Sequence, residues 1–219
     1  MLRRKISSHY IAMVLLGLLT CLPSQATAYN IGISNPSFEA DVLNEGDSLF
    51  GATSWDSMFY AGIWNPPTDW PSSSFPYTPP DGNNVGWVNT HGLGSYLQQT
   101  LNATLLDNTN YTLMVDIGHR PDYIDIPPYK VQLIAGGQIL AEGSGFDPGY
   151  NKFGTLTINY TSQPSDPIGN NLVIQFSSDT QVNFDNVRLT ATAVPIPGAL
   201  WLFSSGLLGL IGHYRSRRF

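Results

Sequence analysis

The chain has 219 residues and a formal net charge of −6, from 10 Lys and Arg against 16 Asp and Glu. All 16 acidic residues lie between its two ends, with only four basic residues among them: Arg120, Lys130, Lys152 and Arg188. So acidic a surface repels phosphate backbones, which excludes nucleic acid as a partner. Because the one cysteine, Cys21, lies near the N-terminus, the rest of the chain has no disulfide and no thiolate site.

The N-terminus has the three parts of a secretory signal. A basic start, Arg3–Lys5, precedes the apolar run Ile11–Leu19 and the small-residue site Ala26-Thr27-Ala28. The apolar run is well short of the ~20 residues that cross a bilayer, which argues against an anchor. We therefore expect residues 1–28 to be a signal peptide that is removed on export.

Residues 29–192 lack any long amphipathic helix and instead alternate apolar and polar residues between Gly, Pro, Asn and Asp clusters. A period of two with one polar face is typical of half-solvated antiparallel strands. The pattern predicts an all-β, two-sheet antiparallel jelly-roll sandwich of eight or nine strands. The expected strands are Trp55–Ile63, Asn84–Asn89, Tyr96–Leu101, Tyr111–Ile117, Tyr129–Ala135, Ile139–Glu142, Leu156–Tyr160, Leu172–Phe176 and Val182–Thr190.

Two local features of these strands can be predicted. Ala135-Gly136-Gly137-Gln138 has the composition of a tight hairpin turn. In the last strand the apolar pairs Val182/Phe184 and Val187/Leu189 are one residue out of step, which a β-bulge at Asp185-Asn186 would correct while re-aiming Asp185. The alternative is that the strand switches the neighbour it covers.

Two long proline-rich loops, Ile63–Pro80 and Pro121–Tyr129, contain several aromatic residues. Exposed aromatic rings in such loops stack on the apolar C–H faces of sugars, so the pattern predicts sugar binding. The residues expected to bind a ligand are Trp64, Trp70, Tyr77 and Tyr123. Trp55 and Trp87 lie in strand-like contexts and are expected in the core, and packing remains the alternative for the whole group.

The C-terminal residues 193–219 break the β pattern. The prolines of Val194-Pro195-Ile196-Pro197 precede the uncharged apolar segment 198–212 and a basic end. The residues of this motif are Val194, Pro195, Pro197, Arg215, Arg217 and Arg218. Fifteen apolar residues make a short hydrophobic helix, and terminal arginines favour the cytoplasmic side.

This tail resembles the PEP-CTERM sorting signal of Gram-negative bacteria, although Ile196 stands where that signal usually has Glu. The resemblance implies an exosortase-type transpeptidase as partner, and transient anchoring in the inner membrane. It further implies delivery to the cell surface or an extracellular biofilm matrix, with extracellular polysaccharide as a possible partner. An ordinary C-terminal anchor is the alternative.

The ends of the domain carry a second resemblance. Asn35-Pro36-Ser37-Phe38-Glu39 and Phe184-Asp185-Asn186-Val187-Arg188-Leu189 resemble the ends of galactose-binding-like jelly rolls, as in carbohydrate-binding modules. The resemblance implies a structural calcium ion held by Glu39 and Asp185, and oxygen ligands in an acidic domain suit that ion. The alternative is that both carboxylates bond only to nearby backbone amides.

Enzyme motifs are weak. His91 and His119 have no partner at zinc-ligand spacing, and no G-x-S-x-G sequence occurs. Asp116, Asp122 and Asp125, near His119, could imitate a glycosidase pair. The sequence is therefore interpreted as a non-catalytic surface or matrix protein with a carbohydrate-binding-like sandwich. The alternatives are a self-assembling matrix protein without sugar affinity and a polysaccharide-active hydrolase.

Overall fold

The computed structural model describes residues 26–69, 77–89, 93–195 and 206. It divides into two units, Ala28–Ala193 and a unit formed by the two ends of the chain. Most of the predicted signal peptide and sorting tail lie outside the described residues, including Pro197 and the three terminal arginines, and both stay predictions. In the described part of the chain, no helix combines the length and apolar character needed to cross a membrane.

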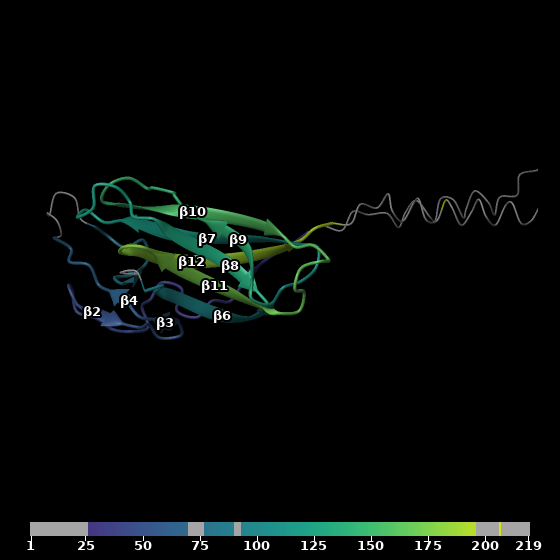
Figure 1. Cartoon of the computed structure of the whole chain (residues 1–219), viewed down its shortest axis with the longest axis horizontal. Coiled ribbons are helices and arrows are strands. Elements are labelled where there is room, and N and C mark those ends of the chain that lie inside the picture. The colour runs from purple at the N-terminus through teal and green to yellow at the C-terminus, as the bar shows by residue number, and fades with distance from the viewer. Residues whose placement is uncertain (1–25, 70–76, 90–92, 196–205, 207–219) are drawn as a thin grey trace, which may run out of the picture. The chain divides into compact units, whose positions relative to one another are not determined.

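Two antiparallel sheets form a sandwich (Figure 1). The first contains Ala28–Ile31 (β1), Ser48–Phe50 (β2), Ala61–Trp64 (β4), Val85–Val88 (β5), Thr109–His119 (β7), Lys152–Thr161 (β10) and Val182–Ala193 (β12). Its order is β10-β7-β12-β5-β4-β2, and β1 also pairs with β12. The second has the order β3-β6-β11-β8-β9 and contains Asp56–Met58 (β3), Tyr96–Thr104 (β6), Tyr129–Ala135 (β8), Gln138–Gly143 (β9) and Asn171–Ser178 (β11). The predicted all-β, two-sheet jelly-roll sandwich is confirmed.

The core lies between the sheets and follows from the alternation along the strands. Leu113, Val115 and Ile117 of β7 point inward and are fully buried. Phe184 of β12 and Phe176 of β11 join the layers, with ring centroids 4.7 Å apart and planes 8° from parallel. Burial of each such side chain contributes ~1.5–3 kcal/mol, which makes these alternating positions the main source of stability.

Both predicted local features are present. Gly136 and Gly137 link β8 to β9 with φ of 55° and 78°, the left-handed conformation that a two-residue hairpin turn requires. The pairing of β12 with β7 shifts register between Asp185 and Arg188, and Asn186 has φ 48°. The β-bulge at Asp185-Asn186 is therefore confirmed.

The N-terminal part of the fold differs from the prediction. Trp55–Ile63 is not one strand, because Phe59 adopts φ 54° and breaks the run into β3 and β4, which belong to different sheets. Strands β1 and β2 were not predicted. Nearly all their side chains are exposed, so they show no alternation in the sequence.

Candidate functional site

Six residues in register cross the face of the seven-stranded sheet that is turned away from the core. Residues directly opposite each other in antiparallel strands point to the same side, so their side chains form one row. This outer row consists of Phe153, Gly118, Asn183, Trp87, Gly62 and Phe50. It runs from Phe50, 64% exposed, past the ring of Trp87 at 5.4 Å to Asn183, which is fully buried.

Tyr77 packs onto the outer row at Gly118. A Cβ atom at position 118 would lie 2.0 Å from the Tyr77 hydroxyl oxygen, so only glycine leaves room for this ring. The Tyr77 ring lies 4.7 Å from Phe153 and 6.2 Å from Trp64. Burial raises the pKa of Tyr77 well above its usual range, so the hydroxyl keeps its proton.

Arg120 joins two more of the predicted ligand-binding residues. Its guanidinium lies 5.1 Å from the centre of the Trp64 ring and 5.6 Å from that of Tyr123. Asp122 fixes the guanidinium through two hydrogen bonds, from Nε at 2.9 Å and Nη2 at 2.6 Å. Trp64, Tyr77 and Tyr123 are thus brought to one place, whereas Trp70 lies outside the described residues.

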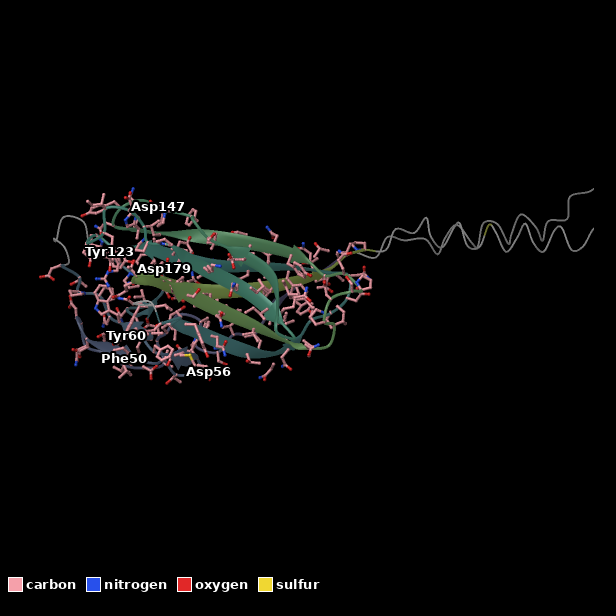
Figure 2. The ribbon with its side chains drawn as sticks, viewed as in Figure 1. Phe50, Asp56, Tyr60, Tyr123, Asp147 and Asp179 are labelled. Atoms are coloured by element: carbon pink, nitrogen blue, oxygen red, sulfur yellow. The ribbon has the colours of Figure 1, made fainter. Side chains whose placement is uncertain are left out.

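Beside this group, His119 connects the loop that contains Tyr123 to the loop that contains Asp147. Its Nδ1 lies 2.8 Å from the Asp147 carboxylate, and its Nε2 lies 3.2 Å from the carbonyl oxygen of Tyr123. Figure 2 shows Tyr123 and Asp147 at the same end of the sandwich as Phe50 and Tyr60. Burial acts to raise the pKa of Asp147, but the Gly149 N–H and His119 outweigh it and lower that pKa. The loops therefore meet beside the β7 and β10 end of the outer row, across the sheet from Phe50.

Asp185 follows Asn183 by two residues on β12, so it points to the same face of the sheet. It is fully buried, and its two oxygens accept the backbone N–H groups of Asp81 at 3.0 Å and Asn186 at 2.7 Å. Burial, with smaller contributions from the charges of Asp81 and Asp116, raises the pKa of Asp185 to about 8. Burial therefore favours the protonated form of Asp185.

The bulge that presents Asp185 is held by Asp116. The Asn186 side chain donates to Asp116 Oδ2 at 2.9 Å, while Arg188 and Thr155 donate to Asp116 Oδ1 at 3.1 and 2.5 Å. These bonds fix Asn186 in the left-handed conformation, from which its N–H reaches Asp185. Asp116 therefore supports Asp185 through the bulge.

Glu39 and Asp185, the predicted calcium ligands, hold the same segment of chain. Glu39 Oε1 accepts the N–H groups of Asn83 at 2.8 Å and Asn84 at 2.5 Å, next to Asp81, whose N–H bonds to Asp185. Within the described residues, no three Asp, Glu, His or Cys side chains are grouped to hold a metal ion. Both carboxylates bond to backbone N–H groups of this segment, and calcium stays a prediction.

Trp55 and Trp87 are both buried, as predicted. Trp55 stacks on Phe176 in the core, 5.3 Å between centroids, whereas Trp87 belongs to the outer row and donates through Nε1 to the Ile63 carbonyl. Sequence reasoning missed Asn183, Phe153 and Arg120. The sequence did contain a signal for Asn183. It is the polar residue between the apolar Val182 and Phe184, and in a strand it therefore points away from the core.

A family model described as HpiC1 cyclase, of the HpiC1-like family, matches residues 29–190. The chain belongs to the HpiC1-like cyclase family. A Stig cyclase, Fisc from Fischerella sp. TAU, solved with (3Z)-3-(1-methyl-2-pyrrolidinylidene)-3H-indole, is 30% identical, with a TM-score of 0.64. The match covers 75% of this chain and 98% of that one.

Two further solved structures are similar. A cyclase from Fischerella sp. TAU in complex with 4-(1H-indol-3-yl)butan-2-one is 27% identical, with a TM-score of 0.59, over 74% of this chain and 97% of that one. An apo form cyclase from Fischerella sp. is 26% identical, with a TM-score of 0.60, over 75% and 96%. A comparison with curated proteins finds no match.

These similarities overturn the interpretation as a non-catalytic matrix protein. The family and the solved relatives are cyclases, and they point to an enzyme. The sequence argument failed because it looked for nucleophiles, zinc ligands and paired carboxylates. An acid beside an aromatic surface needs none of those motifs, and register across strands creates it. The carbohydrate-binding-module resemblance holds for the jelly-roll fold alone.

Proposed function

We propose that this protein is a cyclase that closes a ring in an apolar, unsaturated, indole-type substrate by acid-promoted carbon–carbon bond formation. The observation that carries the proposal is the fully buried carboxyl of Asp185 on the same face as the outer row, where burial raises its pKa to about 8. A carboxyl group that keeps its proton at neutral pH serves as a general acid.

The aromatic side chains supply the binding surface. Phe50 and Trp87 of the outer row, with Trp64 and Tyr77 beside it, offer ring faces and edges for a flat apolar substrate. Two relatives were solved with indole-containing molecules, and this supports an indole-type ring as the substrate's flat part. The few polar groups among these rings would set its orientation.

The chemistry follows from the acid and the rings. Asp185 donates its proton to a carbon of a substrate double bond, whose π electrons form the new C–H bond and leave a cation. A second double bond attacks that cation, forming the ring C–C bond, and a proton is then lost to the Asp185 carboxylate. No electrons are gained or lost overall, so the product is an isomer of the substrate.

Two features of the site favour these reaction steps. Aromatic faces stabilise a cation by ~0.5–2 kcal/mol each, more when water is excluded. The N–H groups of Asp81 and Asn186 stabilise the carboxylate that remains after proton donation. Burial of Tyr77 and Trp87 keeps water from capturing the cation, since water would divert it to an alcohol.

Incubation of the purified protein with a set of 3-alkenylindoles tests this function. Liquid chromatography with mass spectrometry should find a product of unchanged mass and different retention, absent without protein. Asp185→Asn should lower its formation at least ~100-fold, the range that one general acid contributes. Failure to isomerise any member of the set, with binding of the set intact, would count against the proposed reaction.

We also infer that the protein is exported and sorted at its C-terminus. The motivation is the basic and apolar pattern at residues 1–28 together with Val194-Pro195-Ile196-Pro197 and the arginines that close the chain. An exosortase-type transpeptidase would be the partner. Cell fractionation and mass spectrometry of both termini test this, and an unprocessed protein in the cytoplasm would contradict it.

A further inference from the structure

Asn183 is a buried amide in the middle of the outer row. Its neighbours along the strand, Val182 and Phe184, point into the core, while in register it lies between Gly118 and Trp87. Its exposed fraction is 0%. Asn183 is thus a buried polar side chain in a row that also contains the aromatic residues Trp87 and Phe153.

Neither polar atom of the Asn183 side chain is satisfied by a hydrogen bond. Neither Nδ2 nor Oδ1 has a hydrogen-bond partner among the described residues, and no other buried side chain there has both polar atoms in this state. The Asn183 amide faces the Tyr77 hydroxyl and acts to lower the pKa of Tyr77, against the larger effect of burial. An unsatisfied buried donor or acceptor costs ~1–3 kcal/mol, so such groups are rare unless a ligand uses them.

The row leads from the surface to this amide. Phe50 is exposed, its ring contacts Trp87, and Trp87 is the register partner of Asn183. Figure 2 shows Phe50 at the exposed end, next to Tyr60. A flat ring that stacks along this aromatic path would bring its edge to the amide.

We propose that Asn183 is a substrate-recognition residue, whose Oδ1 accepts a hydrogen bond from the ring N–H of a heteroaromatic substrate. This inference rests on the proposed function for the class of substrate, but it concerns binding and not turnover. Nδ2 then donates to an acceptor on the substrate side chain. The residue thus selects N–H-bearing rings over N-alkylated ones, because an N-methyl group would leave the amide unmet.

Binding of two probes to the purified full chain tests the proposal without requiring catalysis. The probes are 4-(1H-indol-3-yl)butan-2-one and its N-methylindole analogue, measured by titration calorimetry. Wild type should bind the N–H probe at least ~10-fold more tightly, and Asn183→Leu should remove the preference. Asn183→Asp, which keeps an acceptor, should retain it. Asn159→Leu, on β10 and bonded to Thr112, is the control that should leave the preference unchanged.

The melting temperature supplies a second readout. Because Asn183→Leu removes two unmet polar groups at similar volume, that variant should melt no lower than wild type. A marked drop would show a structural amide and overturn the proposal. Equal binding of the two probes to wild type would also overturn the proposal, because it would mean that water, and not the probe, forms the hydrogen bonds of Asn183. If the preference is present but no isomer forms, the recognition role stands and the proposed reaction fails.

Discussion

The hydroxyl of Tyr77 occupies the space above Gly118 that any other residue would fill, with only 2.0 Å between its oxygen and the position of a Cβ atom. Through this contact, a loop residue far from β7 in sequence becomes part of the face that carries Asn183 and Asp185. The site therefore depends on a glycine in the middle of a strand, where glycine is otherwise unfavourable.

Gly118→Ala should displace Tyr77, since the new methyl group would also lie 2.5 Å from the Phe153 ring. Overpacking of this kind costs ~1–3 kcal/mol in the free energy of unfolding. Binding of indole probes should weaken in parallel, because the Tyr77 ring would leave the row. Urea denaturation and calorimetry measure the two effects. Gly32→Ala, with nothing within 4 Å of its Cβ, is the control, and equal behaviour of the two variants would refute the close contact.

The bulge at Asn186 gives a graded prediction. Asn186→Ala loses the hydrogen bond to Asp116 and places a Cβ residue at φ 48°, where most residues pay ~1–2 kcal/mol. Asn186→Gly loses the same hydrogen bond but accepts the conformation. We expect the alanine variant to unfold at clearly lower urea concentration than the glycine variant. The reverse order would mean that the left-handed conformation is not needed to present Asp185.

The pKa of Asp185 predicts how stability changes with pH. Its folded value of about 8 lies above the ~3.9 of an unfolded aspartate, so the contribution to stability is full below pH ~4. It is lost as pH rises toward 8, by up to ~1.4 kcal/mol per pH unit, because the unfolded chain releases the proton first. Wild type should thus lose stability across this window relative to Asp185→Asn. Parallel curves from urea melts at several pH values would contradict the raised pKa.

Calcium and the proton compete for one carboxylate. If Glu39 and Asp185 bind calcium, as the domain-end motifs predict, the ion must hold Asp185 ionised. We therefore expect added calcium to raise the melting temperature at pH 7 and to slow isomer formation, with EDTA reversing both. Glu39→Gln should weaken the calcium effect without removing the acid. A melting temperature that neither calcium nor EDTA moves would remove calcium from this site.

Much of the sandwich could be read from the sequence because buried strands alternate. The hairpin at Gly136-Gly137 and the bulge at Asp185-Asn186 follow from turn chemistry and from a one-residue slip in the apolar pattern. The candidate site was harder to predict from the sequence, because it depends on the register between paired strands. Phe153 and Asn183 are 30 positions apart in the chain, and only pairing through Gly118 places them in one row. Nothing in the sequence reveals that Asp185 is fully buried, which raises its pKa.

Solvent deuterium incorporation tests the central claim most directly. The account holds that Asp185 gives a proton to a substrate carbon, so the protein is first equilibrated in D₂O and then used in excess over the substrate. In D₂O, the isomer formed from a 3-alkenylindole should carry one deuterium on the protonated carbon, and Asp185→Asn should form almost none of it. An isomer without deuterium, or undiminished formation by Asp185→Asn, would contradict an acid-promoted cyclase.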